Sequence, residues 1–174
     1  MQPTSAAVAL ASDGQNRQAH LIVTVSIDYQ LVGTGWARCS IDLDGKAVEI
    51  TGSYLSDCLG GLADAAVQLL QGAASARCSF DEEPGEYRCI IDRTDGQVRL
   101  RVLEFQELWG NRPDLEGKVL LDGQCALAAL VGAVRGALQR VVDEHGVEGY
   151  KDRWVEHDFP AAQLRALQAA ARSE

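Results

Sequence analysis

The chain has 174 residues, of which 47% are hydrophobic and 24% charged, and its formal net charge at pH 7 is −9. These fractions are typical of a globular protein and exclude a disordered or collagen-like chain. The acidic balance disfavours nucleic acid, whose phosphates repel negative charge, and it favours basic protein partners, because net charge steers encounter.

The N-terminal segment is rich in Ala, Ser and Gln, and we expect a flexible tail over residues 1–18 before a single domain over residues 19–174. The apolar run Ala6–Ala11 is too short for a signal peptide, and no Lys or Arg precedes it. No stretch reaches the roughly 20 apolar residues that a membrane helix needs. Five widely spaced cysteines without a C-x-x-C pair favour free thiols in a cytoplasmic protein.

Alternation and turn residues predict three consecutive strands. Every second residue between positions 20 and 32 is apolar, as in a strand with one buried face. A second strand is predicted over Trp36–Leu43, and Asp44-Gly45 is a strong signal for a two-residue hairpin turn. Across that turn the register pairs apolar residues with each other: Ile41 with Val48, and Cys39 with Ile50.

The next segment predicts a helix, a strand and an acidic turn. The helix runs from about Asp57 to Gln71, with Ser56 or Ser53 as its N-cap. A short strand follows over Arg77–Phe80. The turn over Asp81–Glu86 comes next, and its Pro84-Gly85 pair fits a type II turn.

A second hairpin is predicted around Asp95-Gly96, with strands over Tyr87–Arg93 and Gln97–Leu108. Its register pairs Ile91 with Leu100 and Cys89 with Val102 on the buried face, and Asp92 with Arg99 on the outer face. A loop over Gly110–Gly117 and a short strand over Lys118–Leu121 follow.

The C-terminal part is helical. An apolar stripe from Leu127 to His145 predicts a long helix that ends at Gly146, and a mixed loop then leads to a final helix over Ala161–Arg172. The complete order is β-β-β-α-β-β-β-β-α-α. It predicts an α+β fold, with one antiparallel sheet of about six to seven strands and the helices packed on one face.

The inward cysteine of each hairpin places neighbouring arginines on the open face of the sheet. Arginine suits carboxylate and phosphate, so this face is a candidate anion-binding platform. The alternative is a solvated face on which Arg–Asp pairs neutralise each other. The candidate anion-binding residues are Arg38, Arg88, Arg99 and Arg101.

Two kinds of surface segment are candidates for contact with a protein partner. The acidic turn could meet a basic partner, and it lacks the layout of a calcium loop. The segments with Trp109 and with residues 150–154 combine aromatic and charged side chains, as interface anchors do, although such aromatics also cover the end of a core. The candidate partner-binding residues are Glu82, Glu83, Glu86, Trp109, Tyr150 and Trp154.

No sequence pattern indicates a catalytic, metal or cofactor site. The three histidines lack metal-ligand spacing, and no G-x-S-x-G, P-loop or G-x-G-x-x-G motif occurs. His157-Asp158 has the form of a base with its orienting carboxylate, but nothing in the sequence marks a nucleophile for it. We therefore name no catalytic residue, metal or cofactor, and we lean against an enzyme.

Several motifs together resemble a loose set of small uncharacterised bacterial α+β proteins, over most of the chain after residue 20. They are Gly35-Trp36-Ala37, Ser53-Tyr54-Leu55-Ser56-Asp57, Glu83-Pro84-Gly85-Glu86-Tyr87, Trp154 and Phe159-Pro160. This resemblance implies no activity. In size and charge the chain is also similar to immunity proteins of bacterial toxin systems.

The leading hypothesis is a non-enzymatic, acidic, cytoplasmic protein-binding domain, in one form an immunity protein that neutralises a toxin. One alternative is an acidic dimeric chaperone for a secreted protein. Another is an enzyme or small-anion-binding domain that uses the arginine-bearing sheet face. We expect a protein partner of basic character, with a homodimer as a further option, and no nucleic acid or membrane.

Overall fold

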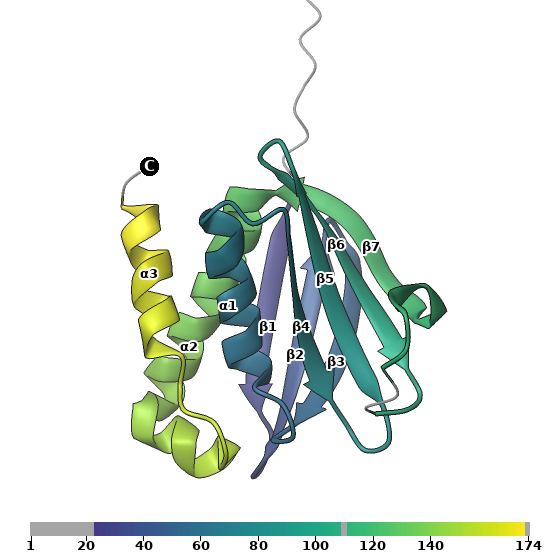
Figure 1. The fold of residues 1–174 in the computed structure, drawn as a ribbon. Helices are drawn as coiled ribbons and strands as arrows, with labels where there is room; N and C mark the ends of the chain where they lie inside the picture. The colour runs from purple at the N-terminus through teal and green to yellow at the C-terminus, as the bar shows by residue number, and fades with distance from the viewer. Residues whose placement is uncertain (1–22, 109–110, 173–174) are drawn as a thin grey trace, which may run out of the picture.

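The computed structural model describes residues 23–108 and 111–172 (Figure 1). Within them the elements follow the predicted order of strands and helices, with one additional 3-10 turn, η1. The strands are β1 (Val25–Leu31), β2 (Trp36–Leu43), β3 (Lys46–Ser53), β4 (Ser75–Asp81), β5 (Glu86–Thr94), β6 (Gln97–Phe105) and β7 (Lys118–Ala126). The helical elements are α1 (Cys58–Leu70), η1 (Asp114–Glu116), α2 (Leu127–Trp154) and α3 (Ala161–Ala171). The tail predicted over residues 1–18 lies outside the described residues.

Both predicted hairpins are confirmed, with their registers. In the β2–β3 hairpin Ile41 pairs with Val48, and in the β5–β6 hairpin Ile91 pairs with Leu100. The turn residues Asp44 and Asp95 have positive φ, and a glycine with positive φ follows each of them. Two consecutive left-handed residues match the turn twist that antiparallel strands require, so the Asp-Gly signal was sufficient to set these registers.

The strands form two antiparallel sheets rather than the single sheet that we predicted. One has the order β1-β2-β3 and the other β4-β5-β6-β7. The helix α1 connects β3 to β4, and the two strands end side by side: the Ser53 hydroxyl donates to the carbonyl of Asp81 at 2.9 Å. Such a crossover makes neighbouring strands parallel, so β4 cannot continue the antiparallel ladder of the first sheet.

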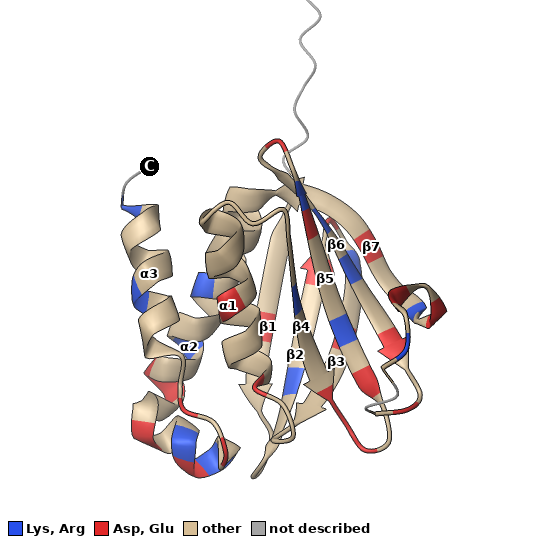
Figure 2. Cartoon of the chain, viewed as in Figure 1, with Lys and Arg blue, Asp and Glu red and all other residues tan. Residues whose placement is uncertain are grey.

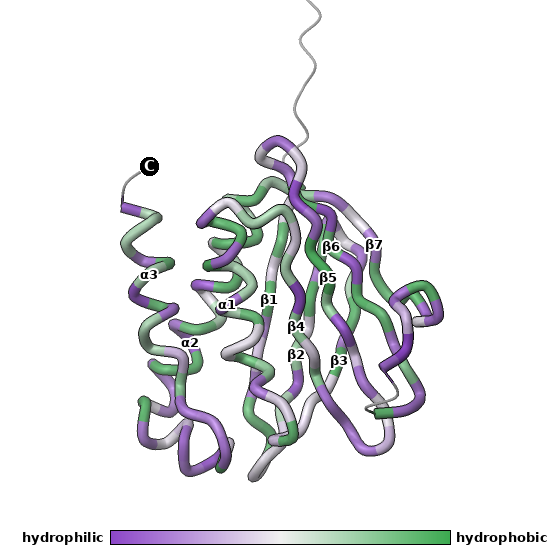
Figure 3. Tube along the Cα trace, viewed as in Figure 1, coloured by the Kyte–Doolittle hydropathy of each residue, from purple (hydrophilic) through white to green (hydrophobic). Residues whose placement is uncertain are grey.

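The α+β class is confirmed, and the three helices gather on one side of the strands (Figure 1). Helix α1 packs on β4, α2 packs on β1, and all three helices contact one another. One core cluster contains residues of both sheets and of all three helices. Its apolar strand and helix segments are the green inner parts of Figure 3. A smaller cluster of Ile90, Leu103 and Phe105 lies apart from this core.

Two helix ends differ from the prediction. Asp57 itself caps α1, because its carboxylate accepts the amide of Gly60 at 3.0 Å, whereas we expected Ser56 or Ser53 in that position. The long helix does break at Gly146, where φ is 68°, but a second helical piece continues to Trp154. The segment predicted as a loop is therefore helical. Tyr150 and Trp154 are four residues apart, so they lie on one face of this piece and are buried together.

The remaining differences concern strand ends and one turn. Strands β4 and β7 are longer than predicted, and β6 ends at Phe105. The acidic turn is not of type II, because Gly85 does not have the positive φ that this turn requires, and the Glu83–Pro84 peptide is cis. The turn closes instead through the Glu82 amide, which donates to the Gly85 carbonyl at 2.7 Å.

Candidate functional site

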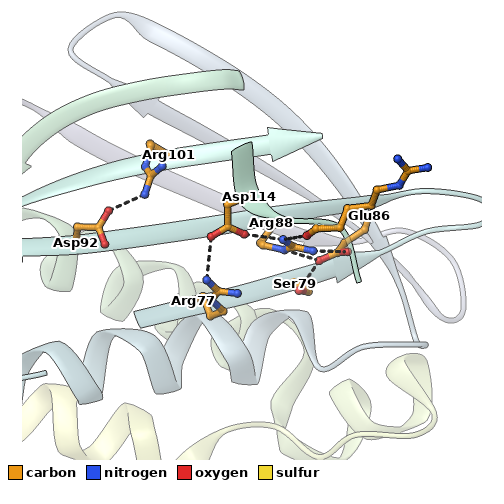
Figure 4. A network of polar contacts seen from close by, with 8 residues as sticks. Arg77, Ser79, Glu86, Arg88, Asp92, Arg101 and Asp114 are labelled. Atoms are coloured by element: carbon orange, nitrogen blue, oxygen red, sulfur yellow. Dashed lines mark hydrogen bonds and ion pairs between the residues drawn. The ribbon is translucent and has the colours of Figure 1, made fainter. Parts of the chain in front are cut away.

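The first candidate surface is the outer face of the β4–β7 sheet, which we call the charged face. Figure 2 shows acidic and basic residues side by side along β5, β6 and β7. At its centre lies Arg88, a residue that is only 8% exposed, and its guanidinium forms two hydrogen bonds with Glu86 at 3.0 and 3.1 Å and one with Asp114 at 2.6 Å (Figure 4). It also lies 4.3 Å from the ring centre of Phe105. The bonds to Glu86 raise the pKa of Arg88, so this cation is permanent.

The other predicted anion-binding arginines are also paired with carboxylates. Arg99 contacts Asp122 at 2.6 and 2.8 Å, Arg101 contacts Asp92 at 2.7 Å, and Arg38 lies 3.6 Å from Glu49 on the other sheet. Asp92 and Arg99 are paired across the strands as predicted, but their side chains form ion pairs with diagonal neighbours: Asp92 with Arg101, and Arg99 with Asp122. The hydrogen bonds from Arg99 lower the pKa of Asp122.

The charged face has a hollow of about 680 Å³ between β4, β5 and the residues before η1. Its lining includes three arginines and three acidic residues, so its charges balance; they are Arg77, Arg88, Arg112, Asp81, Glu86 and Asp114. Asp114 joins Arg77 to Arg88, and Ser79 donates to Glu86 at 2.9 Å (Figure 4). An incoming anion would have to displace these internal carboxylates, which makes the face a poor anion trap.

The predicted partner-binding residues do not come together. Tyr150 and Trp154 are completely buried, so the prediction that they anchor a partner is wrong and they cover the end of the core. Glu86 is held by Arg88, and Glu82 accepts a hydrogen bond from the Thr51 hydroxyl. Glu83 is exposed. Trp109 lies outside the described residues.

His157 and Asp158 do not form a catalytic pair. The Asp158 carboxylate, which would have to orient the His157 imidazole, instead forms an ion pair with the Lys151 ammonium group at 3.0 Å. Among residues 23–108 and 111–172 no group of three or more His, Cys, Asp and Glu side chains is arranged to hold a metal ion. In the same residues no helix is long and apolar enough to cross a membrane.

The second candidate surface is at the opposite ends of the strands from the two Asp-Gly turns. It consists of four large hydrophobic side chains that are 41 to 45% exposed, and we call it the apolar end: Val32, Trp36, Tyr54 and Val155. They come from three connections that lie at the bottom of Figure 1, namely β1–β2, β3–α1 and α2–α3. They are four of the seven large hydrophobic residues that are exposed in the described part of the chain.

Main-chain hydrogen bonds centred on Gly35 join the three connections. The Gly35 amide donates to the Arg153 carbonyl at 2.7 Å, and the Gly35 carbonyl accepts the Tyr54 amide at 2.9 Å. The Val32 amide donates to the Trp36 carbonyl at 2.8 Å. Gly35 has a φ of 73°, and a Cβ atom there would lie 2.9 Å from the Tyr54 ring, so this position requires glycine. The apolar end is thus fixed by backbone rather than by side-chain contacts.

Val155 has a strained backbone. Its φ and ψ are 74° and −66°, and the Glu156 amide donates to the Trp154 carbonyl at 2.9 Å across it. This is the rare form of γ-turn with positive φ, which is especially unfavourable for a β-branched residue. Strain of this kind costs of order 1–3 kcal/mol and concentrates at functional sites. Here it accompanies an apolar side chain that is 45% exposed.

Beneath the apolar end lies a rigid aromatic cluster. Trp154 has its ring centre 6.5 Å from that of Tyr29 and 6.3 Å from that of Tyr150, and Tyr150 lies 5.5 Å from Phe159. Within the described residues, the hydroxyls of both tyrosines and the Trp154 indole N–H form no hydrogen bond of normal geometry. Burial raises the pKa of both tyrosines, which therefore stay neutral. Packing therefore holds these rings, and the Tyr29 hydroxyl, which lies close to that of Tyr150, opposes the rise in the pKa of Tyr150.

The start of α1 borders this cluster and shows the same effect of burial. Burial raises the pKa of the Asp57 carboxyl, although the Gly60 amide opposes the shift. It also raises the pKa of the neighbouring Cys58 thiol to about 12, so this thiol is not a nucleophile at neutral pH. The helix start therefore serves to cap α1 and to close the core.

The sequence contained a signal for the apolar end that we did not use. Ala37 and Cys39 point inward on β2, so the alternation places Trp36 outward. The same resemblance motifs, Gly35-Trp36-Ala37 and Ser53–Asp57, meet at this surface. The sequence did not predict that Val155 lies next to these motifs, because its position depends on the helical piece after Gly146. In comparisons with protein-family models, with curated proteins and with solved structures, this chain matched none.

Proposed function

We propose that this chain is a protein-binding domain whose contact surface is the apolar end. One observation carries the proposal: four exposed hydrophobic residues lie in or beside three connections whose backbones are joined by hydrogen bonds at Gly35. A cluster of exposed apolar groups marks an interaction site more often than scattered ones do. Because the backbone beneath is already fixed, binding loses little conformational entropy there.

The electrostatics support a protein partner more than a small anion. The arginines of the charged face are paired with internal carboxylates, whereas the chain as a whole has a net charge of −9. That excess attracts a basic protein from a distance, while the apolar end supplies the contact. An immunity protein and a chaperone for a secreted protein are two forms of this same function, and the chaperone form requires a dimer.

A cytoplasmic setting suits the cysteines. All five are free and buried, including Cys78 and Cys89, which are direct partners across β4 and β5. The hydrogen bond between these two thiols, together with burial, raises the pKa of Cys78 well above its ordinary value. A thiol that stays protonated exchanges slowly with disulfides. Free, unreactive cysteines of this kind are typical of proteins from a reducing compartment.

Photo-crosslinking in the organism that makes the protein tests this function. A photoreactive amino acid replaces Trp36, Val155 or, as control, Leu115, which is 89% exposed on the charged face. We expect one and the same protein to be crosslinked from positions 36 and 155 and not from position 115. Equal crosslinking from position 115, or none from 36 and 155, would contradict the proposal.

A further inference from the structure

We propose that the segment bound at the apolar end is an amphipathic helix with a basic polar face. This inference rests on the proposed protein-binding function and adds the chemistry and secondary structure of the partner segment. Two independent features support it: carboxylates on both sides of the apolar end, and backbone groups of Val32, Gly35 and Tyr54 that are already hydrogen-bonded inside the molecule.

On one side the apolar end is bordered by the acidic β4–β5 turn. The Asp81 amide donates to the Ser56 hydroxyl at 2.9 Å, and Thr51 donates to Glu82, so this turn lies against the connection that presents Tyr54. Glu83 in the turn is exposed and makes no ion pair within the described residues. This turn is the acidic segment that the sequence singled out for a basic partner.

On the other side lies the segment that presents Val155. Asp152 and Glu156 are exposed and form no ion pair within the described residues, and Asp158 is shared with Lys151. Arg153 is the one cation of the segment that lacks a carboxylate partner there. The apolar side chains are therefore flanked by more unpaired negative than positive charge, and a partner with Lys or Arg beside its apolar face complements both features.

The backbone at this surface favours a helix over an added strand. The Gly35 amide and carbonyl and the Val32 and Tyr54 amides are already bonded inside the molecule. Strand addition is also hindered at two of the sheet edges: Arg140 of α2 donates to the Ile27 carbonyl on β1, and β7 has an extra residue, Leu120, opposite Val102 and Leu103. These features favour a partner that binds through side chains, as an amphipathic helix does in a groove or on a patch.

Titration calorimetry and amide NMR with designed peptides test the inference. The probe is a Leu/Lys helix of about 18 residues, five turns, with Leu at helical spacing. The comparison peptides are a Leu/Glu helix, a Leu/Lys peptide of scrambled order, and an alternating Leu/Lys peptide that favours a strand. We expect the Leu/Lys helix to bind at least tenfold more tightly than each of these and to shift the amide signals of Gly33, Gly35 and Tyr54.

Matched variants locate the binding. Val155→Asp and Trp36→Ser should each weaken the Leu/Lys helix by about thirtyfold, as loss of an interface anchor does. Leu115→Asp should not. Glu83→Lys combined with Glu156→Lys should also weaken binding, whereas Glu116→Lys on the charged face should leave it unchanged. Circular dichroism and thermal melts confirm that each variant is folded, and Trp36→Ser stands in if Val155→Asp is not.

The outcomes separate this inference from the proposed function. Equal binding of the scrambled, alternating or Leu/Glu peptide, or equal weakening by Glu116→Lys, would overturn the basic helix. If the Leu/Lys helix does not bind while crosslinking from position 36 still captures its protein, the helix is wrong and the function stands. If both experiments fail, both proposals fall.

Discussion

The charged face and the apolar end differ in where their residues find partners. On the charged face the central arginines are ion-paired inside the molecule: Arg88 with Glu86 and Asp114, Arg99 with Asp122, and Arg101 with Asp92, although the buried Nε of Arg101 has no hydrogen-bond partner within the described residues. At the apolar end the amides of Val32, Gly35 and Tyr54 are bonded inside the molecule, but Val32, Trp36, Tyr54 and Val155 remain 41 to 45% exposed. The charges of the charged face are therefore paired within the molecule, whereas the exposed side chains of the apolar end have no apolar cover.

This difference teaches that charge density is a poor guide to a binding surface. A carboxylate next to each arginine removes the field that an external anion would feel, and the pairs contribute little stability where they are exposed. Exposed apolar area lacks such an internal partner and loses its contact with water only when another molecule covers it. The following predictions test whether the two surfaces differ in this way.

Apart from the loss of a whole core ring in the Tyr150→Ala control described below, the largest effect is expected on the charged face, from Arg88→Met. This change leaves Glu86 and Asp114 without their cation in a partly buried site, and we expect the free energy of unfolding to fall by about 3 kcal/mol. Urea unfolding measures it. Arg112→Met, which breaks only exposed ion pairs with Glu107 and Glu116, is the control and should change little. An Arg88 variant as stable as the parent would show that the network is not structural.

Val155→Gly tests the strain at the apolar end. Glycine adopts positive φ without steric cost, so we expect this variant to gain about 1 kcal/mol of stability while it loses partner binding. Val147→Gly, in the helical piece after Gly146, should instead lose about 0.5 kcal/mol. Thermal unfolding distinguishes the two. A destabilised Val155→Gly variant would mean that the side chain, rather than the strained turn, matters for folding.

The pH dependence of stability tests the border between core and apolar end at Asp57. Its pKa is raised by burial, so its favourable contribution is present below the ordinary value of 3.8 and is lost as pH rises through the folded-state pKa. Asparagine keeps the cap without the charge. As the pH rises from 3 to 7, the free energy of unfolding of Asp57→Asn should therefore increase relative to that of the parent protein. The increase should be less than about 1 kcal/mol because the site is half-exposed. Urea unfolding of both proteins at a series of pH values measures the difference, and a difference that stays constant from pH 3 to pH 7 would contradict this prediction.

The smallest effect is expected from Tyr150→Phe, beneath the apolar end. The hydroxyl has no hydrogen bond of normal geometry within the described residues, so its removal should change stability by no more than about 0.5 kcal/mol. Tyr150→Ala, which removes the ring from the cluster, should cost about 3–5 kcal/mol. A large loss from Tyr150→Phe in urea unfolding would show that the hydroxyl is bonded in solution.

Local patterns predicted most of the fold. Alternation placed Cys39 and Cys89 inward, the two Asp-Gly turns set both hairpin registers, and Gly146 ended the first part of α2. These features depend on residues close together in the chain, where turn geometry and hydrophobic spacing act directly. The division into two sheets was not predicted, because it depends on how α1 returns the chain beside β3.

The candidate site was predicted less well, for the same reason. Arg88, Arg99 and Arg101 share one sheet face as predicted, whereas Arg38 lies on the other sheet. The sequence also does not say that Asp114, 26 residues after Arg88, pairs with it. Tyr150 and Trp154 were placed in a surface loop, and a helical piece buries them instead.

The sequence by itself determined the order of elements, the hairpin registers and the inward and outward faces of the strands. Only the tertiary structure decided which exposed residues meet, because Gly35 joins connections that are more than a hundred residues apart through its bond to Arg153. Whether a surface is satisfied internally or left for a partner depends on such long-range contacts, and no local pattern encodes them.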